Sequence, residues 1–111
     1  MEHKNVIRVR DFSVVPGSRY RDEGKTAHSG EEFRESWLKP EFVKARKANQ
    51  ILLVDLDGTI GYGTSWLEEV FGGLVREYDK ETVESVLRFV SNEEPYLIDD
   101  INEYIRDAKN K

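Results

Sequence analysis

Two aspartates and two hydroxyl residues lie close together near the middle of the sequence, and these side chains are the best suited to chemistry. Asp55 and Asp57 follow an apolar run, and Thr64 and Ser65 follow a turn rich in glycine. A carboxylate beside a cation can attack phosphorus and form an acyl phosphate. A hydroxyl at the start of a helix can itself carry phosphate, because free amides and the helix dipole favour an anion there. The segment predicts either phosphoryl chemistry or a phosphorylation switch.

The aspartate pair resembles the first motif of the haloacid-dehalogenase-type phosphatases. The resemblance covers residues 51–59 (ILLVDLDGT). It implies a Mg²⁺-dependent phosphatase in which Asp55 is the nucleophile and Asp57 protonates the leaving group. That family also uses a lysine between its second motif and its acidic pair, and the corresponding residues 92–98 hold neither lysine nor arginine. The phosphatase is therefore kept as the alternative function.

A longer resemblance covers residues 19–38, 53–76 and 89–105. These stretches are similar to a bacterial STAS-like family of unassigned function, with its aspartate-rich strand end, Gly-Tyr-Gly turn and Leu-Glu-Glu-x-Phe-Gly-Gly-Leu helix. The resemblance implies the fold of anti-sigma-factor antagonists and a signalling protein that docks a partner without catalysis. In that wider superfamily a serine is phosphorylated by a kinase that is also an anti-sigma factor. The implied partner is a histidine-kinase-like ATPase.

In this resemblance Thr64 matches the phosphoacceptor serine and Ser65 matches its neighbour. The chain departs from the superfamily pattern at Gly63, where an aspartate is expected, and at Trp66, where a glycine is expected. Both hydroxyl residues also suit an ordinary helix N-cap, so the structural alternative stays open. The chain has no Walker-type loop or kinase signature, and any phosphoryl donor must be another protein.

The turn and the following helix also supply the predicted docking surface. A glycine inside a helix costs about 1 kcal/mol relative to alanine, so the adjacent glycines indicate close approach of a partner helix or close packing within the domain. The glutamate pair predicts an acidic rim or a solvated face, and the tryptophan predicts an interface anchor or a core residue. The predicted partner-binding residues are Tyr62, Gly63, Thr64, Trp66, Glu68, Glu69, Gly72 and Gly73.

The hydrophobic pattern predicts strands that alternate with helices. Residues 5–12 alternate like a half-buried strand, residues 18–23 are expected to pair with it, and residues 86–90 form a further strand. The apolar run at residues 50–56 predicts the central strand of the sheet, covered on both faces. We expect a single domain, residues 1–111, with an α/β, STAS-like, single-layer mixed sheet of about four strands and three main helices.

Three helices are predicted from capping residues and apolar spacing. The first begins at Ser29 with a capping box, kinks or restarts at Pro40, and ends at Ala48 or Asn49. The second begins at Ser65, where a capping box to Glu68 is expected, and the third follows the polar stretch at residues 91–95.

Composition restricts the function. Residues 1–50 hold 11 Lys and Arg against 8 Asp and Glu, while residues 51–111 hold 6 against 14, so the second half would repel nucleic acid. The chain has no cysteine and no apolar run of about 18 residues, which predicts a cytoplasmic protein without a signal peptide or membrane span. His3 and His28 are isolated, so neither is assigned to a metal.

The sequence thus predicts a non-enzymatic regulatory or adaptor domain with no cofactor, no metal and no catalytic residue. Its docking partner is a protein, and the phosphoacceptor candidates are Thr64 and Ser65. A self-associating structural domain, which would form a homo-oligomer, is the third class left open.

Overall fold

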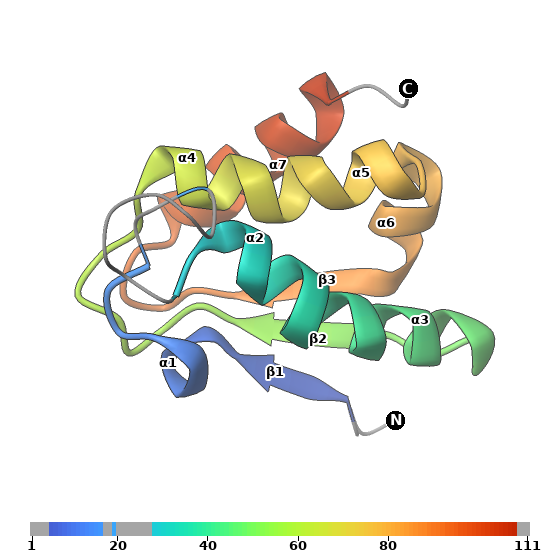
Figure 1. Ribbon diagram of the computed structural model, residues 1–111, viewed down its shortest axis with the longest axis horizontal. Coiled ribbons are helices and arrows are strands. Elements are labelled where there is room, and N and C mark those ends of the chain that lie inside the picture. Colours follow the sequence, from blue (N-terminus) through green and yellow to red (C-terminus); the bar gives the residue numbers. More distant parts are fainter. Residues whose placement is uncertain (1–4, 17–18, 20–27, 109–111) are drawn as a thin grey trace.

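Three parallel strands form one sheet in the computed structural model, which describes residues 5–16, 19 and 28–108 (Figure 1). The strands β1 (Val6–Arg8), β2 (Leu52–Asp55) and β3 (Leu87–Val90) lie in the order β1-β2-β3. The predicted central strand is therefore confirmed as β2. The expected mixed sheet of about four strands is wrong for the described residues, where three strands are all parallel. The strand predicted at residues 18–23 falls outside them, Arg19 excepted.

The first predicted strand is shorter than its alternation indicated. After Arg8 the chain turns into the short helix α1 (Val9–Phe12). Val9 and Phe12 are both buried, at a spacing of three that suits a helix and not a strand. Phe12 meets the rings of Phe33 and Trp37 edge-on at 5.2 and 5.3 Å between centroids. This aromatic contact, which periodicity could not reveal, decides the conformation of residues 9–12.

The first long helix, residues 30–47, consists of α2 (Gly30–Glu32), a π-helical turn η1 (Phe33–Leu38) and α3 (Lys39–Lys47). The predicted cap is confirmed, because the Ser29 hydroxyl accepts a hydrogen bond from the Glu32 amide at 3.1 Å. Pro40 lies in the first turn of α3, where a missing amide proton is tolerated, so the helix restarts there without breaking.

The second long helix, residues 64–77, is built in the same way from α4 (Thr64–Leu67), the π-helical η2 (Glu68–Gly72) and α5 (Gly73–Glu77). Its N-cap is Gly63, and no side chain caps it. The predicted capping box from Ser65 to Glu68 is therefore wrong, because the helix begins one residue earlier and Glu68 bonds to arginines instead.

Two further helices complete the described chain. α6 (Lys80–Val86) precedes β3, and α7 (Tyr96–Asp107) follows it. The described residues thus contain five helices, four of them with seven or more residues, where three main helices were expected. None of the described helices is long and apolar enough to span a membrane.

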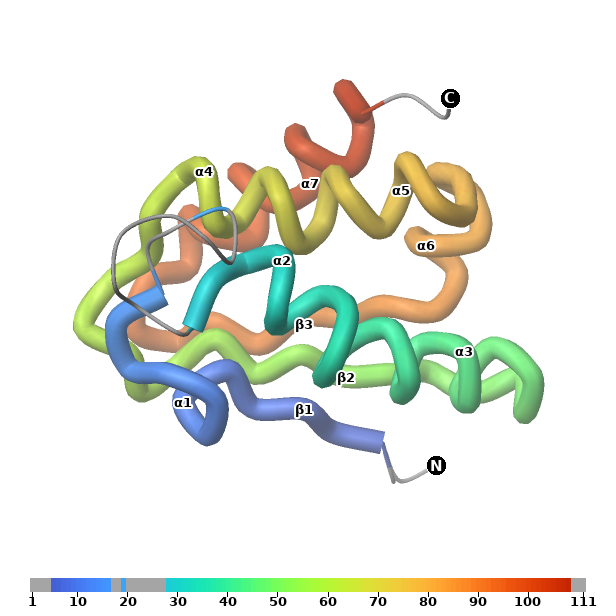
Figure 2. The backbone as a smooth tube through the Cα atoms, viewed as in Figure 1, coloured from blue at the N-terminus to red at the C-terminus, as the bar shows by residue number. Residues whose placement is uncertain are grey.

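The long helices lie on one side of the sheet (Figures 1 and 2). Side chains along a strand alternate between faces, and Ile7, Leu52, Val54 and Leu87 turn toward the helices and are buried. They form one core with the apolar faces of both long helices and α7. Because all three strands run the same way, their last residues meet at one edge, here called the carboxyl edge.

Candidate functional site

The loops that follow the three strands meet at the carboxyl edge, where ligands of open α/β sheets usually bind. An arginine ties two of these loops together. Arg10 Nη1 lies 3.2 Å from Asp55 Oδ2 and 3.1 Å from the carbonyl oxygen of Asp57. Asp55 Oδ1 accepts the Asp57 amide at 3.0 Å. Both Asp55 oxygens therefore already bind protein donors.

Asp57 joins the loop after β2 to the loop after β3. Its Oδ1 accepts the Glu93 amide at 2.9 Å, and its Oδ2 accepts Asn92 Nδ2 at 3.2 Å. The backbone hydrogen bond from Glu93, with those from Asn92 and the nearby Arg10 charge, holds the pKa of the Asp57 carboxyl below its ordinary value. In return, Glu93 Oε1 accepts the amide of Gly58 at 2.8 Å.

Gly58 is required in this arrangement. Its φ of +91° is a conformation that other residues rarely adopt, and a Cβ there would lie 2.5 Å from Arg10 Cδ. The aspartates, Arg10 and Gly58 thus hold the three loops in one conformation.

The loop at residues 56–63 is anchored at its base and exposed at its tip. The Tyr62 hydroxyl donates to the Leu56 carbonyl oxygen at 2.7 Å, and burial raises the pKa of Tyr62. The Ile60 amide donates to the Val14 carbonyl oxygen at 2.7 Å, and the Gly63 amide donates to the Pro16 carbonyl oxygen at 2.9 Å. The last two hydrogen bonds hold the loop against residues 13–16.

Three exposed apolar side chains lie on these two joined segments. Ile60 is 81% exposed, Val15 is 63% exposed and Val14 is 47% exposed. We call this group the apolar tip. Exposed aliphatic side chains that gather on an ordered surface often mark an interaction site. The sequence analysis did not select them, although valine and isoleucine between polar turn residues were a visible signal.

The two predicted phosphoacceptors follow directly after the tip. Thr64, the first residue of the second long helix, is exposed, and Ser65 is partly buried. The amides of a first helical turn have no acceptor within the helix. A phosphate on Thr64 would therefore meet amide donors and the positive end of the helix dipole.

Trp66 is a core residue and not an interface anchor. Its side chain is fully buried, with ring centroids 5.2 Å from Phe33 and 5.7 Å from Tyr62. Its indole nitrogen donates to the carbonyl oxygen of His28 at 3.3 Å. The structure thus favours burial, the structural alternative left open for this residue, and removes its side chain from the docking surface.

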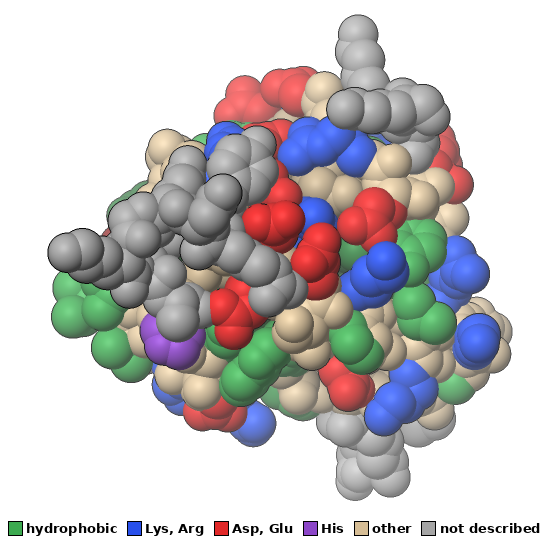
Figure 3. Space-filling view, viewed as in Figure 1, with side chains coloured by type: hydrophobic (Ala, Val, Ile, Leu, Met, Phe, Trp, Pro, Cys, Tyr) green, Lys and Arg blue, Asp and Glu red, His purple; other side chains and the backbone are tan. Residues whose placement is uncertain are grey.

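One member of each pair in the second long helix, Glu69 and Gly73, faces Arg34 of the first long helix. Glu69 is 6% exposed, and its Oε2 lies 2.7 Å from Nη1 of Arg34, which is 8% exposed. Glu68 binds Arg19 and Arg76, each at 2.7 Å, and the hydrogen bond from Arg76 is the main cause of its lowered pKa. Figure 3 shows acidic and basic side chains interleaved on this side of the molecule. The expected acidic rim is in fact a network of ion pairs.

The glycines make room for that network. A Cβ at Gly73 would lie 2.8 Å from Arg34 Nη1, and a Cβ at Gly72 would lie 2.5 Å from Glu68 Oε2. Both glycines are buried. Close packing within the domain, one of the two predicted reasons for the pair, is therefore the one that the structure supports.

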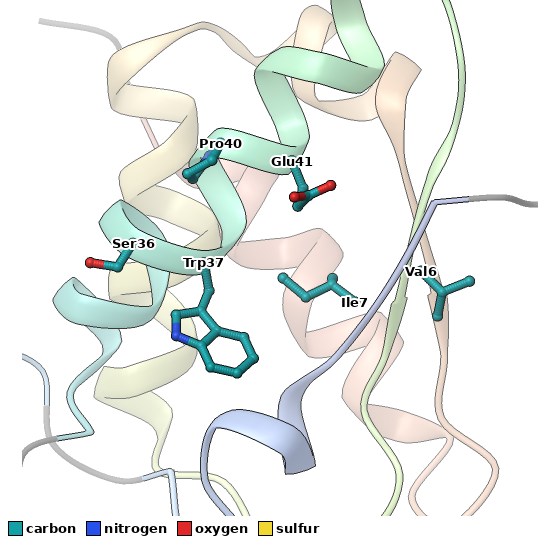
Figure 4. Close-up of a pocket in the computed structure, with 6 residues that line it drawn as sticks. All are labelled: Val6, Ile7, Ser36, Trp37, Pro40 and Glu41. Carbon is teal, nitrogen blue, oxygen red and sulfur yellow. The ribbon is translucent and has the colours of Figure 1, made fainter.

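Two grooves lie away from these residues. The first, of about 380 Å³, runs beside β1 and is lined by Val6, Ile7, Ser36, Trp37, Pro40 and Glu41 (Figure 4). The second, of about 500 Å³, lies beside β3 and is lined by Glu84, Leu87, Arg88, Phe89, Ile98 and Asn102. Neither is lined by a predicted site residue. Within the described part of the chain, no group of three or more His, Asp or Glu residues is placed to hold a metal ion.

Comparison with known protein families assigns the chain to one family. Residues 29–97 match the family described as "STAS-like domain of unknown function (DUF4325)". The chain belongs to this STAS-like family. The match contains the second long helix and both predicted phosphoacceptors, and it confirms the family resemblance of the sequence. No curated protein and no solved structure matches the STAS-like chain significantly.

Proposed function

We propose that this STAS-like protein is a non-enzymatic regulatory or adaptor domain that docks a protein partner through its carboxyl edge. The observation that carries the proposal is the apolar tip, an exposed aliphatic surface on two segments joined by backbone hydrogen bonds. Segments held together by backbone hydrogen bonds lose less conformational entropy on binding than a free loop would, which favours affinity. Tyr62, Gly63 and Thr64 flank it and complete the docking surface. The absence of cysteine agrees with a reducing cytoplasm as the place of action.

Thr64 is the proposed switch of this surface. It is exposed and lies four residues after Ile60. A phosphate there would add nearly two negative charges beside an apolar contact, and burial of such a charge against a partner is unfavourable. Phosphorylation is therefore proposed to release the partner. The kinase implied by the family resemblance is a histidine-kinase-like ATPase.

A crosslinking experiment tests the docking surface. A photoreactive amino acid replaces Ile60 in one variant and Ala48 in the control, which lies just after α3 at the opposite end of the molecule from the loop at residues 56–63 (Figure 1). We expect one protein to crosslink through position 60 only, and Ile60→Asp to abolish its recovery. Equal crosslinking from both positions would count against the proposal, as would full recovery with Ile60→Asp.

Phosphorylation is tested on the same sample. Mass spectrometry of residues 59–65 is expected to show phosphate on Thr64, and Thr64→Glu is expected to reduce crosslinking from position 60. Circular dichroism should show that Thr64→Glu keeps the fold, because the residue is exposed. If Thr64 is unmodified in cells where the partner is released, the proposed phosphorylation switch is wrong, while the docking proposal is unaffected.

The two alternatives make different predictions. A Mg²⁺-dependent phosphatase would hydrolyse an aryl phosphate and lose that activity with Asp55→Asn. The hydrogen bonds at Asp55 and Asp57 favour a structural role in holding the loops together, since their carboxylate oxygens bind Arg10, Asn92 and backbone amides. A self-associating domain would form a stable oligomer in light scattering that Ile60→Asp dissociates.

A further inference from the structure

The sheet has one face that no described helix covers. Parallel sheets in α/β proteins are usually covered on both faces, and their strands are apolar on both. Here β2 alternates between buried and partly exposed residues, and the long helices lie on the side of its buried residues. Figure 4, which views the strands from another direction, again places the helices on one side only. The second face of the sheet is open among the described residues, so the predicted cover of the central strand on both faces is wrong for them.

Strand register shows which side chains form this open face. One row across the sheet contains Val6, Leu53 and Arg88, and the next contains Arg8, Asp55 and Val90. The three aliphatic side chains are partly exposed, and both arginines are exposed. The open face therefore carries three aliphatic side chains, with an arginine at each of two opposite corners.

The two arginines lack carboxylate partners in the described chain. Arg8 takes part in no ion pair there, and Arg88 donates only to the carbonyl oxygens of Glu84 and Leu87, both at 2.8 Å. Asp55, the acidic residue of the two rows, is already paired with Arg10. The face thus keeps a positive charge, although the whole chain has a net charge of −5.

We propose that the open face binds an amphipathic helix of a partner protein, with aliphatic residues on one side and acidic residues at the edges of that side. Leucines would contact Leu53, Val6 and Val90, and carboxylates would pair with Arg8 and Arg88. Three strands about 4.8 Å apart are nearly as wide as one helix, whose diameter is about 10 Å. A helix in this position would give the parallel sheet its second cover.

The chemistry of the face favours such a helix over nucleic acid. Neither row contains an aromatic side chain on which a base could stack, and the chain as a whole repels phosphate. This interface is separate from the apolar tip, which lies on the loops beyond the carboxyl edge. It also does not depend on the docking role proposed for that tip.

Titration with a designed peptide tests the inference. The probe is a helical peptide of about 18 residues with leucines on one face and glutamates beside them, a length at which isolated helices begin to form. We expect amide NMR signals of Val6, Leu53 and Val90 to shift, while those of residues 60–64 stay in place. Leu53→Ser should weaken binding, and Arg88→Glu should weaken it about fivefold or more, as loss and reversal of a charge pair would.

Matched controls separate this contact from general attraction. Lys47→Glu makes a comparable charge change at the end of α3 and should leave binding unchanged. A peptide with lysines in place of the glutamates should bind Arg88→Glu better than it binds the unchanged protein. The inference is overturned if the acidic peptide fails to shift the sheet signals or if Arg88→Glu binds it equally well. Stronger shifts of the same signals by a 12-nucleotide single-stranded RNA would also overturn it.

Discussion

Glu69 and Arg34 form a buried ion pair between the two long helices. Each side chain is about nine-tenths buried, and the surrounding arginines and glutamates extend the pair into a network. Taking such charges out of water is expensive unless each keeps a partner at close range. The pair therefore matters for stability mainly because each buried charge would lack a partner without the other, and less because of a net gain from their attraction.

Removal of one partner should be far more harmful than removal of both. We expect Glu69→Leu to lower the free energy of unfolding by about 3 kcal/mol, because Arg34 stays buried without its main partner. The double variant Arg34→Met, Glu69→Leu should lose clearly less than the single one. Urea unfolding followed by circular dichroism measures both. A loss below about 1 kcal/mol in the single variant would mean that neighbouring glutamates replace Glu69.

Asp57 should make stability depend on pH. Its pKa in the folded protein is below its ordinary value of 3.8, so its contribution is present above that value and is lost as pH falls toward the folded pKa. We expect the stability advantage of the unchanged protein over Asp57→Asn to be constant above about pH 5 and to shrink below about pH 4. Urea unfolding at several pH values, with Asp99→Asn as the comparison, measures it. An advantage that grows in acid would contradict the assigned hydrogen bonds.

At the scale of elements, both long helices contain a π-helical turn, and the two turns contact each other. Such turns insert an extra residue into a helix and are common where side chains need an unusual direction. Here the turns carry Arg34 and Glu69, which meet beside the backbone of Gly73. Glycine, π-helical turn and ion pair are thus parts of one helix contact.

Gly73→Ala should destabilise the protein despite the higher helix propensity of alanine. The new Cβ would lie 2.8 Å from Arg34 Nη1 and 3.0 Å from its Cδ, and Arg34 is held by Glu69 and Glu77. We expect a net loss of about 1–2 kcal/mol, where propensity alone would predict a gain of about 1 kcal/mol. Thermal unfolding measures the difference. Gly61→Ala, with no atom within 4 Å of the new Cβ, is the control, and a stabilised Gly73→Ala would contradict the packing.

At the end of the first long helix, in contrast, glycine should be the more stabilising residue. Asn49 has φ of +58°, and the bonds from Asn49 to Arg46 and from Gln50 to Ala45 form a Schellman motif. Asn49→Gly is expected to raise the free energy of unfolding by about 0.5 kcal/mol, since glycine adopts positive φ without strain. Ala48→Gly, one residue earlier at φ of −84°, should lower it. Chemical denaturation measures the free energy of unfolding of both variants. If Ala48→Gly were the more stable variant, the Schellman motif would not be the cause of the difference.

At the scale of the whole molecule, the fold extends beyond the stretch that identifies the family. Residues 29–97 match the STAS-like family, but β1, α1 and most of α7 lie outside that range. These outer parts supply buried core residues, among them Val9, Phe12, Ile101 and Ile105. The matched stretch alone therefore lacks one edge strand and one wall of the core.

A fragment of residues 29–97 should consequently fail to fold. Without β1 the helix-facing side of β2 loses its contact with Ile7, and without residues 98–107 the second long helix loses most of its contact with α7. We expect the fragment to show little near-ultraviolet circular dichroism and collapsed NMR dispersion, while residues 1–111 show a cooperative transition. A fragment that unfolds cooperatively would show that the outer elements are dispensable.

Local patterns sufficed for much of the fold and for part of the site. The apolar run predicted the central strand, Ser29 predicted the start of a helix, and the stretches at residues 19–38, 53–76 and 89–105 indicated the family. These features depend on neighbours in the chain, and so they can be read from a single sequence. The apolar tip could be found only in part. The sequence shows that its side chains are apolar, but their exposure depends on which other segments of the fold cover them.

Tertiary structure decided the features that depend on contacts distant in sequence. Burial of Trp66, the pairing of Glu68 with Arg19 and of Glu69 with Arg34, and the turn of residues 9–12 into a helix each require a segment more than 15 residues away. The same holds for the open face of the sheet, since strand order and helix placement determine which face stays uncovered. Sequence pattern shows that a side chain is apolar or charged, and only the fold shows which other side chain it meets.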